Sequence, residues 1–174
     1  MKVREASWVA CHFAATVVTG CADTATSRPC ACACVTPSGP VSTVDEKTGE
    51  ALRTALQDER RAESFYRAVM ARHGEVRPFA NIVHAEVRHQ SVVTAVMRRH
   101  GVEIPPPDAI GVPAVPDTLR ECNRVAAGLE RENIAMYDRL LSDVREDDVR
   151  TAFENLRAAS MNNHLPAFEA WANR

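Results

Sequence analysis

Five prolines interrupt the chain between Val102 and Pro116, in the sequence VEIPPPDAIGVPAVP. Proline lacks the N–H that a helical hydrogen bond needs, and its ring collides with the preceding turn, so this segment excludes a helix. On both sides of it, from residue 43 onward, apolar residues recur at spacings of three and four, and no convincing strand alternation occurs. The sequence therefore predicts an all-α chain that one long connection divides into two halves.

The spacing of apolar residues predicts two helices in each half, joined by a link of only a few residues. We expect them over Asp45–His73, Val76–His100, Asp117–Asp143 and from Glu146 to the C-terminus. Thr43-x-x-Glu46 and Thr118-x-x-Glu121 can form capping boxes at two of the starts, and Gly74 is a natural terminator. Short links make each half an antiparallel hairpin, whereas an up-down-up-down bundle would not need the fifteen residues of the crossover. We therefore expect a four-helix bundle over residues 43–174, made of two hairpins and a long Pro-rich crossover.

Length and charge set broad limits on the protein. A chain of 174 residues suits one domain of ordinary size with tails. The apolar content of 45% and the charged content of 25% are normal for a globular protein. A net charge of −2 gives no reason to expect a nucleic-acid partner.

Residues 1–21 have the features of a secretory signal peptide. Lys2 and Arg4 precede a short apolar run, and Val18-Thr19-Gly20-Cys21 resembles a bacterial lipobox, in which Cys21 would carry the lipid. The run is too short to span a bilayer as a mature anchor. We expect export to the cell envelope, with membrane attachment only through the lipid at Cys21. An ordinary N-terminal tail is the alternative.

Residues 22–42 are rich in Ala, Thr, Ser, Pro and Cys and predict a flexible spacer. Cys30, Cys32 and Cys34 alternate within it and could hold a soft metal ion. No second group of thiols accompanies them, so their role stays open. Cys122, on a helix, is interpreted as a small buried apolar residue.

Metal-ligand side chains fall on the apolar face of every predicted helix. They are Glu59 in the first helix, Glu86 and His89 in the second, Glu130 in the third and His164 in the fourth. They lie at similar distances from the hairpin turns, so they should meet at one level of the bundle. Burying three carboxylates together is untenable without cations to neutralise them. The remaining histidines are expected at the surface: His12, His73, His84 and His100.

The two tyrosines repeat one spacing. Tyr66 follows Glu59 by seven residues, and Tyr137 follows Glu130 by seven, each on the first helix of its hairpin. The repeat suggests two related halves. We expect both tyrosines, and Asn133 on the same face as Tyr137, to lie beside the ligands as hydrogen-bond or redox partners.

Four stretches of the sequence, "DERRAESFY", "FANIVHAEVRHQ", "LERENIAMY" and "FENLRAASMNNHLPAF", resemble the ferritin-like superfamily. The resemblance covers Leu56–Trp171 and is closest to a bacterial ferritin-like family that is a domain of unknown function. It implies that Glu59 and Glu130 match the single glutamates of the first and third helices. It further implies that Glu86 and His89 match the Glu-x-x-His of the second helix, and that His164 matches the fourth-helix histidine.

The fourth helix departs from that pattern. A complete di-iron motif has a glutamate three residues before the histidine, and this chain has Met161 there. The loss of one bridging carboxylate puts tight binding of a second metal, and oxidase chemistry, in question. Pro166 is expected to kink the helix just beyond His164.

The resemblance leaves three functional hypotheses. The first is a di-metal carboxylate site for iron, or else manganese, that oxidises ferrous iron or reduces oxygen or peroxide. The second is a module that holds one metal ion for sensing, scavenging or stability. The third is a metal-free bundle that serves as an interaction domain at the envelope. Enzymatic turnover and a homodimeric state both stay open.

Overall fold

The structure is a computed structural model that describes residues 43–107, 111 and 113–174. The predicted signal peptide, the spacer with Cys30, Cys32 and Cys34, and the lipidation at Cys21 lie outside the described residues. The bundle is therefore described by itself.

The described residues form helices and no strand, which confirms the all-α prediction. Three long helices are α1 (Glu46–His73), α2 (Phe79–Arg99) and α3 (Leu119–Asp143). The fourth helical stretch consists of α4 (Asp147–Ala159), the π-helix η1 (Ser160–His164) and α5 (Leu165–Ala172). None of the helices in this part of the chain is long and apolar enough to cross a membrane.

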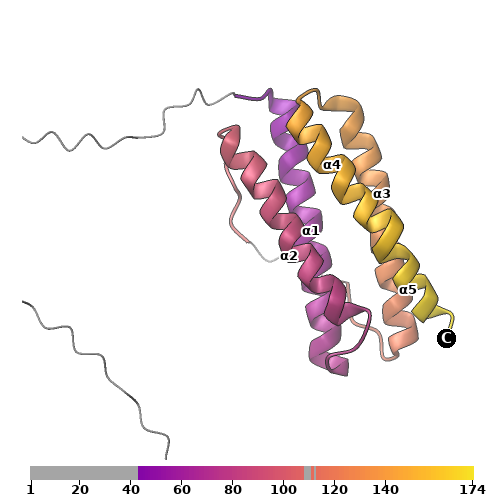
Figure 1. The fold of residues 1–174 in the computed structure, drawn as a ribbon. Coiled ribbons are helices and arrows are strands. Elements are labelled where there is room, and N and C mark those ends of the chain that lie inside the picture. Colours follow the sequence, from indigo (N-terminus) through magenta and orange to yellow (C-terminus); the bar gives the residue numbers. More distant parts are fainter. Residues whose placement is uncertain (1–42, 108–110, 112) are drawn as a thin grey trace, which may run out of the picture. The chain divides into compact units, whose positions relative to one another are not determined.

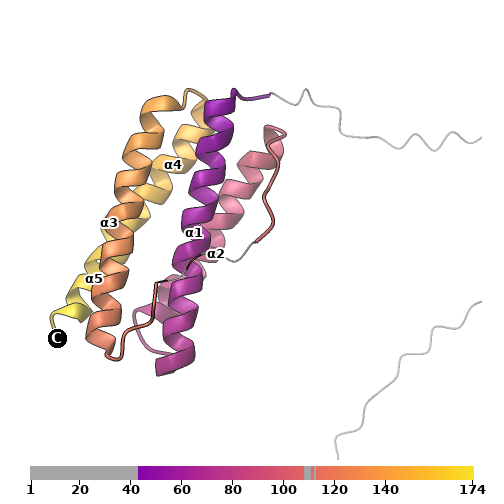
Figure 2. The same cartoon turned by 180° about the vertical axis from the view of Figure 1, so that it is seen from behind.

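The helices form two antiparallel hairpins (Figures 1 and 2). In one hairpin α1 packs on α2, and in the other α3 packs on the fourth helical stretch. The connection leaves the end of α2 at one end of the bundle and reaches the start of α3 at the other, so α2 and α3 run in the same direction (Figure 1). Contacts between α1 and α3 join the two hairpins.

Arginines of α1 hold the proline-rich connection against the bundle. Arg60 Nη1 donates to the carbonyl oxygens of Pro105 and Pro106 at 2.9 and 3.1 Å. Arg72 Nη1 donates to the carbonyl of Val115 at 2.7 Å. A segment that cannot form a helix leaves its carbonyls without helical partners, and these side chains satisfy three of them.

The helix ends follow the predicted signals with two corrections. The first helix does not begin with the predicted Thr43 capping box. Asp45 is its N-cap instead, and its carboxylate accepts from the Thr48 N–H at 2.8 Å, because aspartate caps as well as threonine does. The second helix begins at Phe79 rather than Val76, after Pro78, because a proline disfavours the helical conformation of the residue before it, here Arg77. Thr118 caps α3 as predicted.

The fourth helical stretch is disturbed in the turn that ends at His164 rather than just beyond this residue. The π-helix η1 ends at His164, and α5 continues from Leu165. The proline ring crowds the carbonyl four residues earlier, that of Asn162, so an ordinary helical turn cannot form there. A turn with one additional residue relieves this crowding, and the expected kink takes the form of a π-helix.

His100 was expected at the surface, and this expectation is wrong. It is only 7% exposed, and its Nε2 lies 3.0 Å from both carboxylate oxygens of Asp148. Arg99 also donates to this aspartate, at 2.7 Å. These contacts join the end of α2 to the first turn of α4. His84 is exposed as predicted, and Cys122 is buried as predicted.

Two apolar clusters fill the interior, separated by a polar layer. One cluster gathers around the residues Leu52, Leu56, Val93, Met97 and Phe153. The other gathers around Phe65, Phe79, Ile82, Ala126 and Phe168. The buried polar residues that lie between these clusters come from α1, α2, α3 and η1: Glu59, Glu86, Glu130, Asn133, Ser160 and His164. The apolar clusters position this layer from both sides.

Replacing Val93 by alanine tests the packing of the core. Val93 is 0% exposed, so its loss of two methyl groups should lower the free energy of unfolding by about 2 kcal/mol. The matched control is Val92→Ala, because Val92 is 41% exposed and should change stability by less than about 0.5 kcal/mol. Urea denaturation measures both. Equal effects at the two positions would contradict the described core.

Candidate metal centre

The structure brings together all five side chains that the sequence singled out as ligands. Glu59 comes from α1, Glu86 and His89 from α2, Glu130 from α3 and His164 from η1. Four of them are almost completely buried, and the side chain of His89 is 11% exposed. The cluster is therefore an interior site to which every helical stretch contributes.

The five residues form two groups that share Glu86. Glu59, Glu86 and His89 make one group, and Glu86, Glu130 and His164 make the other, each with its ligand atoms within 4.8 Å of one another. His89 Nδ1 lies 3.0 Å from Glu59 Oε2 and 3.3 Å from Glu86 Oε2. Atoms bonded to one ion at about 2.0–2.2 Å lie roughly 3–4 Å apart. Both groups therefore have spacings that suit a metal ion.

Two polar atoms in the second group lack a hydrogen bond. Glu86 Oε1 and His164 Nδ1 are 3.1 Å apart, and His164 Nδ1 also lies 3.5 Å from Glu130 Oε1, but none of these contacts is aligned as a hydrogen bond. Buried polar atoms are almost always satisfied in native proteins. A cation between them would satisfy both, since each can present a lone pair to it. The types of ligand atom in this group, and the two atoms without a hydrogen bond, are thus compatible with a bound metal ion.

Each tyrosine binds a glutamate of the other hairpin. Tyr66 of α1 donates to Glu130 Oε1 at 2.5 Å, and Tyr137 of α3 donates to Glu59 Oε1 at 2.6 Å. The tyrosine of α1 thus binds the glutamate of α3, and the tyrosine of α3 binds the glutamate of α1. This exchange is what two related halves would produce. The other oxygen of Glu59, Oε2, lies 3.0 Å from His89 Nδ1, whereas Glu130 Oε1 itself lies 3.5 Å from His164 Nδ1.

Asn133 extends the hydrogen bonding toward η1 and α1. Its side-chain N–H groups donate to Asp58 Oδ2 at 2.8 Å and to Glu59 Oε1 at 3.3 Å. Its oxygen accepts from Ser160 Oγ at 2.8 Å. Asn133 therefore lies beside the ligands, as the sequence predicted.

The position that corresponds to the missing carboxylate needs a correction. Met161 does not face the site, since it is 40% exposed and lies near the Arg157 guanidinium. Ser160 faces the interior instead. A π turn holds one residue more than an α turn, so the residue four before His164 shares its face, rather than the residue three before. The buried polar group on this turn is therefore the hydroxyl of Ser160, which donates to Asn133, and no carboxylate lies on it.

Aromatic side chains surround the polar layer and keep it dry. The rings of Tyr66, Phe79 and Phe168 contact one another on one side, at centroid distances of 5.1 to 5.7 Å. Tyr137 packs on Phe153 on the other side at 5.3 Å. The rings of His89 and His164 stack at 5.3 Å. Water is thus excluded from the ligands over most of their surroundings.

Burial and mutual proximity shift the pKa values of the cluster. Burial raises the pKa of Glu59 to about 7. Burial alone would lower the pKa of both histidines, but the carboxylates of Glu59 and Glu86 raise that of His89 to about 9. Glu130 and Glu86 likewise raise the pKa of His164 to about 10. Burial opposes the ionisation of Glu86 as well, but the two histidines hold its pKa below the usual value. The site thus binds protons when no other cation neutralises it.

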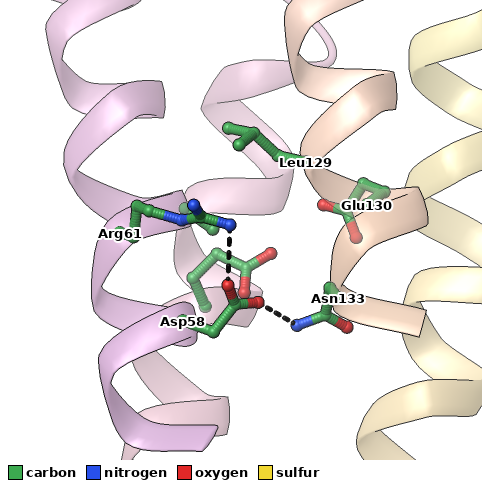
Figure 3. A pocket seen from close by; sticks show the side chains of 7 residues that line it. Asp58, Arg61, Leu129, Glu130 and Asn133 are labelled. Carbon is green, nitrogen blue, oxygen red and sulfur yellow. Dashed lines mark hydrogen bonds and ion pairs between the residues drawn. The ribbon is translucent and has the colours of Figure 1, made fainter. Parts of the chain in front are cut away.

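A small pocket leads from the surface to the ligands between α1 and α3 (Figure 3). Its free space is about 10 Å³, room for about one water-sized sphere. The residues that line it include two ligands: Asp58, Arg61, Ala62, Glu86, Leu129, Glu130 and Asn133. Figure 3 shows Asp58 between Arg61 and Asn133, joined to both by hydrogen bonds.

Sequence reasoning missed two of the residues that shape the site. Asp58 and Arg61 lie beside the apolar stripe of α1. Ser160 falls on the periodic inner face of the fourth helical stretch with Leu156 and His164, and it is buried there. Pro166 predicted a disturbance of this stretch but not its π-helical form. No periodic pattern marks Asp58 or Arg61.

Comparisons with known proteins support the fold. A solved structure, the crystal structure of hypothetical protein MJ0754 from Methanococcus jannaschii DSM 2661, superposes with a TM-score of 0.68. The match covers 78% of this chain and 85% of that chain at 23% sequence identity, so it shows a shared fold alone. No protein-family model and no curated protein matches the chain.

The stability of the metal-free protein should fall as the pH rises from about 6.5 to about 10. Folding raises the pKa of His89 and His164 from 6.5 to about 9 and about 10, so the folded state holds more protons in this range. Stability then decreases with pH, because unfolding releases those protons. Thermal unfolding at fixed ionic strength measures the trend. The double variant His89→Gln, His164→Gln should flatten it, and a rise of stability over this range would contradict the assigned protonation.

Proposed function

We propose that the polar layer is a di-metal carboxylate site, with Glu86 as the ligand shared by two ions. The observation that carries the proposal is the pair of ligand groups that have this one glutamate in common. Glu59 and His89 would complete the first ion's protein ligands. Glu130 and His164 would complete those of the second. The raised pKa values of the two histidines support the proposal, because they show that the site attracts positive charge.

The ligand chemistry favours iron, with manganese as the other candidate. Three carboxylates and two imidazoles offer oxygen and nitrogen donors, which suit these ions better than they suit thiol-seeking metals. Two divalent ions carry a charge that three carboxylates nearly balance. The site therefore suits divalent metal ions in their common oxidation state.

We further propose that the chain belongs among the ferritin-like proteins. That class has two hairpins joined by one long crossover, as this chain does. Its metal ligands include one glutamate from each of two helices and a Glu-x-x-His from another, and this chain has the same residues in those places. The fold match at 23% identity is compatible with the proposal but carries no functional information. Export and lipidation at Cys21 remain predictions from residues 1–42 alone.

Bound ferrous ions would supply one electron each to oxygen or peroxide. The protein's own residues position the ligands and control the surroundings. Tyr66 and Tyr137 hold Glu130 and Glu59 by short hydrogen bonds, which fixes the orientation of both carboxylates. The aromatic rings exclude water and strengthen electrostatic interactions with a bound cation.

A site for one metal ion is the second candidate, and Ser160 is the observation that favours it. Ser160, four residues before His164, offers a hydroxyl and no carboxylate, so the second ion would be held by fewer charges. In this case the group Glu59, Glu86 and His89 would bind alone. The protein would then serve in sensing, scavenging or stability rather than in oxidation.

Metal content and ferrous oxidation distinguish these functions. We expect the full chain, with Cys30, Cys32 and Cys34 changed to serine to remove thiol ligands, to bind two irons and to oxidise Fe²⁺ in air. Glu86→Ala should lose both ions, because both depend on this carboxylate, whereas Glu154→Ala on the exposed face of α4 should lose neither. Elemental analysis and the absorbance of ferric iron measure these results. One ion without oxidation would favour the second candidate, and no ion would reject both.

A further inference from the structure

Asp58 lies between the surface and the candidate metal centre. It is mostly buried, and burial raises the pKa of its carboxyl. One oxygen faces outward to Arg61 Nη2 at 2.9 Å, and the other faces inward to Asn133 Nδ2 at 2.8 Å. Asn133 in turn contacts Glu59, a ligand. A carboxylate is thus the last charged group before the ligands along the pocket between α1 and α3.

Arg61 covers this carboxylate from outside. The same nitrogen, Nη2, donates to Asp58 Oδ1 at 2.9 Å and to Glu132 Oε2 at 3.0 Å. Its side chain is one-third exposed, and that of Glu132 is largely exposed. A partner on the solvent side allows the guanidinium to leave Asp58 without losing every ion pair, so the cover can be displaced at small cost.

The pocket connects Asp58 to metal ligands of both groups. Glu86 and Glu130 line its inner end, and Glu86 Oε1 is one of the atoms without a hydrogen-bond partner. Aromatic rings border the polar layer on two other sides, and His89, which does not line this pocket, has a side chain that is 11% exposed. The free space of about 10 Å³ admits a water-sized species and no larger molecule unless side chains move.

We propose that the pocket between α1 and α3 is the passage by which divalent cations reach the metal centre, with Asp58 as a transfer ligand and Arg61 as its displaceable cover. The proposal rests on the proposed metal-binding function and adds a route to it. An arriving cation replaces the guanidinium beside Asp58, so the buried carboxylate stays neutralised throughout. From Asp58 the ion moves inward to the oxygens of Glu86 and Glu130.

A transfer ligand acts on rates rather than on affinity. Asp58 contacts neither ion in its final position, so its removal should slow binding and release by the same factor and leave the dissociation constant unchanged. A residue that merely supports the ligands would instead weaken the affinity. Comparing rate constants with equilibrium constants separates these two roles.

The experiment measures the binding of Co²⁺ to the full chain, with Cys30, Cys32 and Cys34 changed to serine, by stopped-flow absorbance. We expect Asp58→Asn to bind the same number of ions with the same dissociation constant, but at least ten times more slowly. The amide keeps the size of the side chain and an oxygen that accepts from Asn133. Arg61→Ala should bind Co²⁺ several times faster. The controls are Glu154→Gln and Arg67→Ala, which change the same charges on exposed ion pairs elsewhere.

The outcomes separate the passage from the function itself. If the unchanged chain binds no Co²⁺, the proposed metal-binding function fails and the passage fails with it. If it binds two ions and Asp58→Asn binds them at the same rate, the function stands and the passage is rejected. Slower binding together with a weaker dissociation constant would also overturn the proposal, because Asp58 would then support the bound state.

Discussion

The burial of three carboxylates at one level of a helical bundle is the constraint on which the rest of the structure depends. Glu59, Glu86 and Glu130 would repel one another in a medium of low dielectric constant unless positive charge lies between them. In the metal-free protein His89 and His164 provide that charge by retaining protons. The surrounding hydrogen bonds and aromatic rings enclose a site where protons, or the proposed metal ions, neutralise these carboxylates.

The two hairpins contribute to the site in nearly equivalent ways. The crosswise hydrogen bonds of Tyr66 and Tyr137 make the two long first helices counterparts, each holding a glutamate of the other. The second helical stretches of the two hairpins differ in what they contribute to the site. Three residues before its histidine, α2 offers the carboxylate of Glu86, whereas the fourth stretch offers only the hydroxyl of Ser160, four residues before His164. This asymmetry decides between a two-ion and a one-ion site.

Periodic features of the fold and the site could be predicted from the sequence. Glu59, Glu86, Glu130 and His164 stood out because they interrupt apolar stripes, and a side chain on a stripe is directed inward wherever the helix is regular. The proline-rich segment likewise fixed the long connection, since five prolines exclude a helix regardless of the surroundings.

Features that depend on tertiary contacts could not be predicted. The π-helix over Ser160–His164 follows no residue pattern, although the inward position of Ser160 itself follows from its spacing to Leu156. Asp58 and Arg61 acquire their role only when α3 brings Asn133 and Glu132 beside α1. Asp45 displaced Thr43 as the cap of α1 because both residues can fill that position, and local sequence does not rank them.

Anomalous diffraction from crystals grown with Mn²⁺ tests the central claim most directly. Two peaks are expected within the bundle, one among Glu59, Glu86 and His89 and the other among Glu86, Glu130 and His164, with Glu86 bound to both. Two-metal carboxylate sites place their ions about 3.5–4 Å apart, and a similar separation is expected here. The absence of any peak at Glu86 in crystals with Mn²⁺ bound elsewhere would contradict the claim that a buried metal centre organises this protein.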